Sequence, residues 1–210
     1  MGLPDLNWDL LMTWECDAVL VENCVTFFKV KEPWGELSNM SNDFPLRIGT
    51  VAVGSSEALY QAMRYPHRPD WQREILDAPH AMQAKMKSKK EGRRKTSSRP
   101  DWEAVQIEAM RWVLMVKLAQ HPRTFGRVLR TSGTRAIVER SRKDRYWGAV
   151  ADKDGVLRGK NWLGRLLMEL RDGMVSQGDA AVLRVEQPLI DNCLLLGQPI
   201  PPSVNTGVIK

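Results

Sequence analysis

The segment 101–120 carries the strongest structural signal in this chain, because its apolar residues recur at the spacing of an α-helix. Ile107, Met110, Leu114 and Leu118 follow one another at intervals of three or four residues. Pro122 comes directly after this run, at a place where a helix cannot continue. We therefore predict a helix over 101–120, and any fold of the chain has to accommodate it.

Shorter segments before and after this helix are predicted to form helices or strands. Further helices are predicted over 55–65, 70–76, 79–90, 122–130 and 161–175, the first of them capped by Ser55 or Ser56 and stopped by Pro66. Strands are predicted over 25–30, 136–140 and 181–185, with a strand or hairpin over 46–53 and a loop over 147–160. The chain has 210 residues, which suits one domain. These patterns predict an α-rich α+β domain with a few short strands packed among helices.

Composition excludes several classes of protein. No apolar run approaches the roughly 18 to 20 residues that span a bilayer. Residues 1–28 contain five acids and no Lys or Arg, which is the wrong charge for a secretory or transit segment. The three Cys and three His are scattered, without the spacing of a disulfide framework or a zinc site. We expect a cytoplasmic protein that uses neither a metal nor another cofactor.

The positive charge is concentrated in one place. The basic segment, Lys85–Arg99, holds eight basic residues and one acid, so it carries +7 while the whole chain carries +6. The remaining residues are therefore close to neutral. Such a segment can follow the phosphates of DNA or RNA, although a solvated, mobile loop between two helices is equally compatible with it.

The predicted helix over 55–65 places several polar groups on one face. Glu57, Gln61 and Arg64 are spaced at i, i+4 and i+7, with Tyr60 beside them. Glu57 falls in the first turn, where the positive end of the helix favours an ionised carboxylate. Such a carboxylate suits a general base or a stabiliser of positive charge. The alternative is a capped surface helix whose polar face only meets water.

Two further clusters follow. Glu139–Gly148 comes after a short apolar run and brings acids and aromatic residues, including Asp144 and Trp147, to a loop at a strand end. Gly155–Asn161 precedes a helix and adds glycines and basic side chains, a combination that can form an anion site. A polar turn with Trp147 covering the core, and an ordinary glycine-rich turn, are the competing interpretations.

Familiar catalytic motifs are absent from the sequence. There is no Gly-x-Ser-x-Gly elbow, no paired His metal motif and no dinucleotide fingerprint. Without these motifs, the candidate site consists of the acidic residues, the Trp residues and the predicted anion pocket described above. That combination suits cleavage of a bond at a sugar carbon, because a carboxylate can support an oxocarbenium-like state or activate water while aromatic side chains hold a base.

In this order, the clusters resemble those of the NADAR family of small N-glycosidases. The resemblance extends over roughly residues 26–173. The matching stretches are Phe27–Lys29, Gly35–Asn39, Ser56–Ala62, Trp102–Glu103, Lys117–Pro122, Leu129–Thr131, Val138–Glu139, Asp144–Gly148 and Gly159–Arg171. On this basis we expect a lead-in over 1–24, a NADAR-like domain over 25–176 and a C-terminal extension over 177–210.

The resemblance implies roles for particular residues. Glu57 corresponds to the catalytic carboxylate, supported by Asp144, and the amine of Lys29 is expected to bind phosphate or to trap the opened sugar as an imine. The implied substrate-binding residues are Ser38, Asn39, Tyr60, Gln61, Arg64, Trp102, Trp147, Gly148 and Asn161. The chain departs from the family pattern at Leu37, at Leu59 and at Arg64, which stands where a Lys is common.

The resemblance also implies a substrate class: a ribose joined through a C–N bond to a base or amine. We expect removal of ADP-ribose from guanine in nucleic acid or a nucleotide, with DNA or RNA contacted through Lys85–Arg99. One alternative is hydrolysis of ribosylamino-pyrimidine intermediates of riboflavin biosynthesis. Another is a non-catalytic module that binds ADP-ribose or NAD. The oligomeric state is not predicted.

Overall fold

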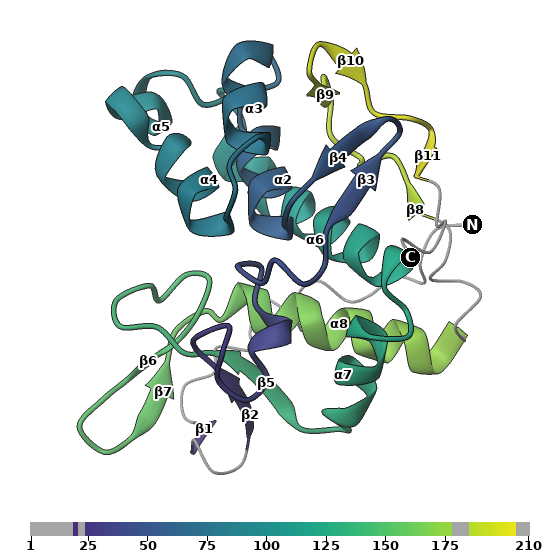
Figure 1. Ribbon diagram of the computed structural model, residues 1–210. Coiled ribbons are helices and arrows are strands. Elements are labelled where there is room, and N and C mark those ends of the chain that lie inside the picture. Colours follow the sequence, from purple (N-terminus) through teal and green to yellow (C-terminus); the bar gives the residue numbers. More distant parts are fainter. Residues whose placement is uncertain (1–18, 21–23, 178–184, 205–210) are drawn as a thin grey trace.

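The computed structural model describes residues 19–20, 24–177 and 185–204 (Figure 1). The α-helices are α2 (Ser56–Met63), α3 (Pro69–Leu76), α4 (Ala81–Lys87), α5 (Arg93–Thr96), α6 (Trp102–Gln120), α7 (Phe125–Thr131) and α8 (Trp162–Gln177), with 3-10 turns η2 (Gly35–Leu37) and η3 (Lys90–Gly92). The strands are β1 (Val19–Leu20), β2 (Cys24–Phe27), β3 (Leu46–Ile48), β4 (Val51–Val53), β5 (Ala136–Glu139), β6 (Val150–Ala151), β7 (Val156–Arg158), β8 (Val185–Glu186), β9 (Leu194–Leu195), β10 (Gln198–Pro199) and β11 (Ser203–Val204).

Helix α6 runs through the middle of the molecule, with α2 on one side and α8 on the other (Figure 1). Its residues Ala109, Val113 and Val116 are fully buried. A helix that is apolar around most of its circumference has to be covered on more than one side. The predicted helix over 101–120 is therefore confirmed, as the central element of the core.

The strands form small separate sheets. β2 pairs in parallel with β5, with Phe27 opposite Glu139, and α8 packs against β5. Two neighbouring parallel strands must be joined by a crossover connection. In this protein the connection runs from the end of β2 to the start of β5 and contains most of the domain. β3 and β4 form the predicted hairpin, which turns at Gly49 with φ of +58°. β7 pairs with both β1 and β6.

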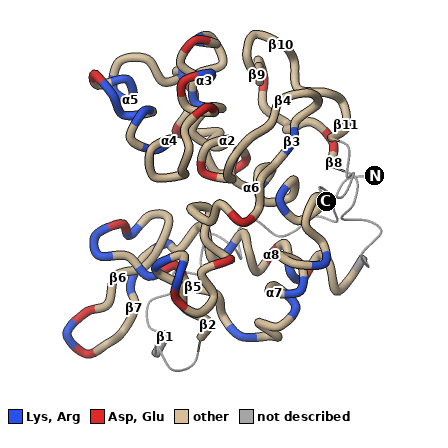
Figure 2. Tube along the Cα trace, viewed as in Figure 1, with Lys and Arg blue, Asp and Glu red and all other residues tan. Residues whose placement is uncertain are grey.

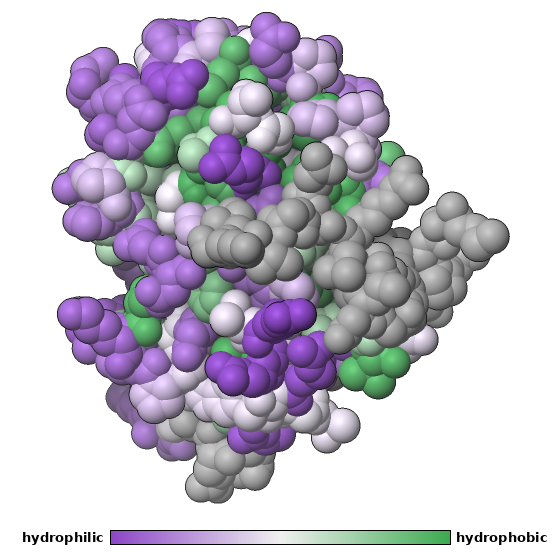
Figure 3. All heavy atoms as spheres, turned by 45° about the vertical axis from the view of Figure 1, so that its right-hand side comes forward, coloured by the Kyte–Doolittle hydropathy of each residue, from purple (hydrophilic) through white to green (hydrophobic). Residues whose placement is uncertain are grey.

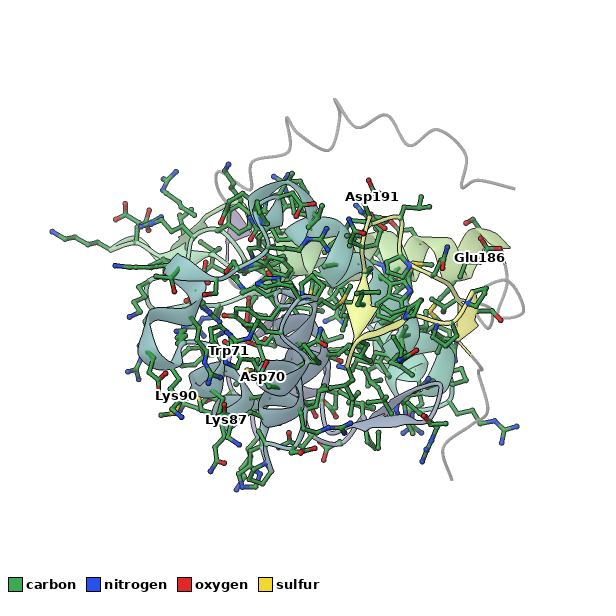
Figure 4. All side chains as sticks on the ribbon, turned by 90° about the horizontal axis from the view of Figure 1, so that it is seen from above. Asp70, Trp71, Lys87, Lys90, Glu186 and Asp191 are labelled. Carbon is green, nitrogen blue, oxygen red and sulfur yellow. The ribbon has the colours of Figure 1, made fainter. Side chains whose placement is uncertain are left out.

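The last described segment, 185–204, lies across α6 and α3. Trp112 Nε1 donates to the Glu186 carbonyl at 2.8 Å, and Arg99 Nη2 donates to the Asp191 carbonyl at 2.6 Å. Glu186 and Asp191 appear on the side of the molecule opposite Trp71 in Figure 4. Val185 is buried. This segment therefore extends the core of the domain.

The fold class is confirmed, and most predicted elements lie within a few residues of the observed ones. The loop predicted over 147–160 is wrong in part, because this stretch contains β6 and β7, whose pairing partners include a strand far away in the chain. The predicted strand over 181–185 lies almost wholly outside the described residues, as does most of the lead-in over 1–24.

Two of the alternatives that concern exposure are wrong. The helix over 55–65 is not a solvated surface helix, because every residue of α2 is buried. The basic segment is not an irregular, fully solvated loop, because it is mostly helical and Arg93 and Arg99 within it are buried. An ion pair helps to hold the basic segment against the domain, since Arg93 Nη2 lies 2.8 Å from Glu74 Oε2 in α3.

Hydrophilic side chains cover most of the described surface on the face that Figure 3 shows, and apolar ones appear there in small patches. Single exposed apolar residues of this kind are ordinary for a folded chain. Within the described ranges, no helix combines the length and the apolar character needed to cross a membrane.

Candidate active site

A cleft of about 690 Å³, open solvent included, lies between two walls. We call α2, α4 and the basic segment the helical wall, and β5 with the loop from Arg140 to Gly148 the strand-loop wall. Lys and Arg gather on α5 and its preceding turn, and again on the loop after β5 (Figure 2). The lining residues are Ser38, Asn39, Met40, Glu57, Tyr60, Gln61, Arg64, Lys85, Lys89, Arg94, Met110, Glu139, Asp144, Trp147 and Leu163.

Glu57 lies in the first turn of α2, as predicted, and its carboxylate is surrounded by donors. The Ser55 hydroxyl caps the helix by accepting the Ala58 amide at 3.2 Å. Gln61 Nε2 donates to Glu57 Oε1 at 2.9 Å, and Lys85 Nζ lies 3.5 Å from the same oxygen. Glu57 is only 5% exposed. The buried carboxylate is therefore held in place by two side-chain donors, one neutral and one charged.

Four cations share the cleft: Arg64, Lys85, Lys89 and Arg94. Burial, Arg94 and Lys85 lower the pKa of Lys89 from its ordinary value, in that order of importance. Burial also lowers the pKa of Arg64. Clustered positive charge inside a low-dielectric cleft attracts anions such as phosphate. Lys85, Lys89 and Arg94 belong to the basic segment, which therefore forms part of the cleft.

Aromatic side chains form the apolar part of the lining. Tyr60 and Trp147 meet edge to face, with ring centroids 5.5 Å apart. Trp102 does not line the cleft; it packs behind, 5.2 Å from the Tyr60 ring and 4.4 Å from the Arg64 guanidinium. Burial raises the pKa of Tyr60 above its ordinary value, so the phenol stays neutral. Its hydroxyl has no hydrogen-bond partner among the described residues.

The strand-loop wall is held together by two side chains that bond to backbone. Asp144 Oδ1 accepts the amides of Tyr146 and Trp147 at 2.9 and 3.0 Å, which orients Trp147 toward the cleft. Asn161 is fully buried; its Oδ1 accepts the Glu139 amide at 3.1 Å and its Nδ2 donates to the Ile137 carbonyl at 2.8 Å. Asn161 therefore supports the wall from behind.

Glu139 is a lining carboxylate that is not among the predicted site residues. Burial raises its pKa to about 7, and the neighbouring Asp144 and Glu57 act in the same direction while Lys85 opposes them. The residue is partly exposed because it faces the open cleft. Its sequence signals were its place at the start of the predicted cluster Glu139–Gly148 and in the stretch Val138–Glu139 that resembles the NADAR family, but no role was assigned to it.

Ser38 and Asn39 line the cleft as predicted. Lys117, which is fully buried, donates from Nζ to the carbonyls of Glu36 at 2.7 Å and Ser38 at 3.3 Å. Burial lowers the pKa of Lys117 to about 7. The Asn39 carbonyl in turn accepts the Glu57 amide at 3.1 Å. This turn therefore connects the start of α2 to the core helix α6.

The structure does not bring Lys29 or Gly148 into the lining. Lys29 pairs with Glu32 at 3.1 Å and its side chain is 65% exposed. Gly148 is needed for close packing instead, because a Cβ atom there would lie 2.5 Å from the Glu139 carbonyl oxygen.

The anion site predicted at the start of the last long helix is not present. The amides of Trp162 and Leu163 already donate to the carbonyls of Tyr146 and Trp147, at 3.1 and 3.0 Å. Arg158 pairs with Asp152 at 2.9 Å. The four cations that line the cleft lie on the helical wall.

A family model described as the NADAR domain matches residues 26–175. The chain belongs to the NADAR family. It is 30% identical over 154 residues to N-glycosidase YbiA of Escherichia coli (strain K12), covering 73% of this chain and 90% of that protein. It is 31% identical over 149 residues to N-glycosidase Npun_R5314 of Nostoc punctiforme, covering 70% of this chain and 90% of that protein.

A solved structure agrees with this assignment. The NMR structure of the Escherichia coli protein YbiA aligns with a TM-score of 0.62 at 27% identity, over 77% of this chain and 90% of that one. The predicted NADAR membership and the predicted enzyme class, an N-glycosidase, are confirmed. This NADAR protein is also 30% identical over 155 residues to riboflavin biosynthesis protein VVA0006 of Vibrio vulnificus, of which the match covers 39%.

Proposed function

We propose that this NADAR protein removes ADP-ribose from guanine, in nucleic acid or in a nucleotide, by hydrolysing the C–N bond at the ribose. The observation that carries the proposal is the cleft, in which a buried carboxylate, Glu57, lies beside four cations and an aromatic wall. Carboxylate, cations and rings match the three parts of such a substrate: the reacting sugar carbon, the diphosphate and the base.

In the proposed reaction the ionised Glu57 stabilises positive charge at the sugar carbon as the C–N bond breaks. The bonding electron pair leaves with the base nitrogen, which takes a proton from Glu139. A water molecule then attacks the sugar carbon and gives its proton to Glu57. Glu139 suits the acid role because its pKa of about 7 leaves a large protonated fraction near neutral pH.

The remaining lining residues hold the substrate. Arg64, Lys85 and Lys89 are assigned to the diphosphate, because their charges face the cleft. Trp147, which is partly exposed, is assigned to the base, which can stack on its ring, and Tyr60 packs edge to face against Trp147. Asp144 acts in this proposal through the loop that carries Trp147.

A second candidate substrate is a phosphorylated ribosylamino-pyrimidine, as the name of the Vibrio vulnificus relative suggests. That substrate carries one phosphate at most, whereas the cleft presents four cations. The charge of the cleft therefore favours the ADP-ribosyl substrate. Both reactions break the same kind of bond and use Glu57 in the same way.

The proposed polymeric substrate would be contacted through the outer face of the basic segment. Lys90 and Lys95 are exposed there, and neutralising DNA or RNA phosphates would release counterions. We propose the cytoplasm as the site of action, in keeping with the sparse cysteines.

The deciding experiment incubates the purified protein with ADP-ribosylated guanine DNA and, separately, with a ribosylamino-pyrimidine phosphate, and measures the released sugar and the released base. We expect release of ADP-ribose from the DNA substrate, and release slower by a factor of about a thousand or more with Glu57→Gln. Release from the pyrimidine alone would favour the second candidate. Binding of ADP-ribose without release from either substrate would favour a non-catalytic module.

The role proposed for Lys29 needs its own test, because an imine requires the amine to leave Glu32 and reach the sugar. If an imine forms, borohydride added during turnover gives a covalent adduct at Lys29, detected by mass, and Lys29→Arg gives none. A wild-type protein without any mass shift counts against the imine.

A further inference from the structure

Gln61 lies between the Glu57 carboxylate and the basic segment, and the two ends of its amide have different partners. Its Nε2 donates to Glu57 Oε1 at 2.9 Å. Its Oε1 accepts from Arg94 Nη2 at 2.7 Å and from Ser88 Oγ at 2.8 Å. Glu57, Gln61 and Ser88 are 5%, 2% and 0% exposed. Buried bonds of this kind are costly to break, because bulk water does not replace them.

The guanidinium of Arg94 determines which end of the amide faces Glu57. Arginine has only donors, so it requires the oxygen of Gln61 on its side. A turned amide would place NH₂ against the guanidinium and oxygen against the Glu57 carboxylate, and both contacts would be repulsive. The hydroxyl of Ser88 can donate or accept, so it does not impose the orientation by itself.

Arg94 is held in place by contacts on both sides. The Ser98 hydroxyl donates to its carbonyl at 2.8 Å, and Arg94 Nη2 also donates to Ser88 Oγ at 3.1 Å. The preceding residue, Arg93, pairs with Glu74 and lies 4.3 Å from the Trp71 ring. Figure 4 shows Trp71 gathered with Asp70, Lys87 and Lys90 at one corner of the molecule.

We propose that Arg94 is a positioning residue that acts through Gln61 and keeps a hydrogen-bond donor directed at the Glu57 carboxylate. This orientation keeps the Gln61 Nε2–H bonded to Glu57 Oε1, so the carboxylate is held in one position for the reaction. Other charged or titratable groups near Glu57 are Lys85, Lys89, Tyr60 and Glu139. The catalytic consequence rests on the proposed function, whereas the orientation of the amide does not.

The kinetic test compares Arg94→Gln with Lys89→Gln, which removes the same charge from the same cleft without touching Gln61. We expect Arg94→Gln to lower kcat about tenfold to a hundredfold, the effect of a lost hydrogen bond to a charged group. We expect Lys89→Gln to act mainly on KM, because Lys89 is assigned to the diphosphate. Arg94→Lys keeps a charge and a donor and should restore part of kcat.

A double-mutant cycle tests whether Arg94 acts through Gln61. Gln61→Met keeps the size of the side chain and removes both amide groups. In that background Arg94→Gln should change kcat far less than it does in the wild-type protein, because the hydrogen bonds from Arg94 to Gln61 and from Gln61 to Glu57 are already absent. An equal loss of kcat in both backgrounds would overturn the proposal.

A measurement without substrate separates this inference from the proposed function. In the wild-type protein the side-chain NH₂ of Gln61 should exchange slowly with water, and NMR of Arg94→Gln should show exchange at least about tenfold faster. Unchanged exchange in Arg94→Gln overturns the positioning role. Absence of turnover by the wild-type protein overturns the proposed function instead, while the exchange result still stands.

Discussion

The two walls of the cleft hold their carboxylates in different ways. In the helical wall, side-chain donors surround Glu57: the amide of Gln61 and the ammonium of Lys85. In the strand-loop wall, Glu139 is held through its backbone, which Asn161 and the paired strand β2 support, while burial raises the pKa of its carboxyl to about 7. The two carboxyl groups therefore differ in environment: donors contact that of Glu57, whereas burial favours the protonated form of Glu139.

The walls also differ in what maintains them. The helical wall depends on charge and hydrogen bonding between side chains, so a substitution there should change kinetics more than stability. The strand-loop wall depends on close backbone packing at Gly148 and on the close approach of Gly164, in α8, to Ile137 of β5, so a substitution at either glycine should change stability first. Substitutions in the two walls can therefore be compared by their effects on turnover and on stability.

Glu57→Gln should lower kcat by a factor of about a thousand or more, within the range seen when a positioned acid or base is lost. The replacement has nearly the same size, so thermal unfolding should change little. The measurement is release of ADP-ribose from ADP-ribosylated DNA, together with a melting curve. Retained turnover in a folded variant would remove Glu57 from the mechanism.

Glu139→Gln should lower kcat/KM about a hundredfold and change its pH dependence. Activity of the wild-type protein should fall as pH rises through about 7, because Glu139 then loses the proton it donates. The variant should lack this decline. A wild-type decline that persists in Glu139→Gln would assign it to another group.

Glu139 should also affect stability, with a defined sign. The folded protein holds this proton more tightly than the unfolded chain, so the free energy of unfolding should fall as pH rises from about 4.3 toward about 7. Urea denaturation at about pH 5 and about pH 8 should show a smaller fall for Glu139→Gln than for the wild-type protein. Equal falls would mean that Glu139 is already ionised in the folded protein.

Gly164→Ala should destabilise the protein by about 2 kcal/mol or more, because its Cβ would lie 2.1 Å from the Ile137 carbonyl oxygen. The matched control is Gly173→Ala in the same helix, where nothing lies within 4 Å; it should stabilise by up to about 1 kcal/mol. Both values follow from urea denaturation. Similar effects at the two positions would argue against close packing as the basis of the strand-loop wall.

Replacing Lys90 and Lys95 by Gln should have the smallest effect. Both side chains are exposed on the outer face of the helical wall, so turnover of a small substrate should be nearly unchanged. For DNA binding, the slope of log K against log salt should become shallower by about 0.7 to 0.9 for each phosphate that is no longer neutralised. Lys153→Gln, at the tip of the β6–β7 turn, is the control; an equal change there would indicate a diffuse charge effect.

Much of the secondary structure was predictable because its signals are local. Ser55 caps α2, Pro122 follows α6, and the apolar spacing within 101–120 needs no distant partner to be recognised. The β6–β7 hairpin was missed because its strands are only two and three residues long and depend on pairing with each other and with β1. Strands this short carry little pattern of their own.

Motifs and spacing along the chain were sufficient to predict the family, the helical framework and the presence of Glu57 in the first turn of a capped helix. Contacts made in the folded chain place Lys85, Lys89 and Arg94 in the lining of the cleft, raise the pKa of Glu139 to about 7 and direct the amide of Gln61 toward Glu57. These properties arise from desolvation and from partners far apart in the chain, which no local pattern contains.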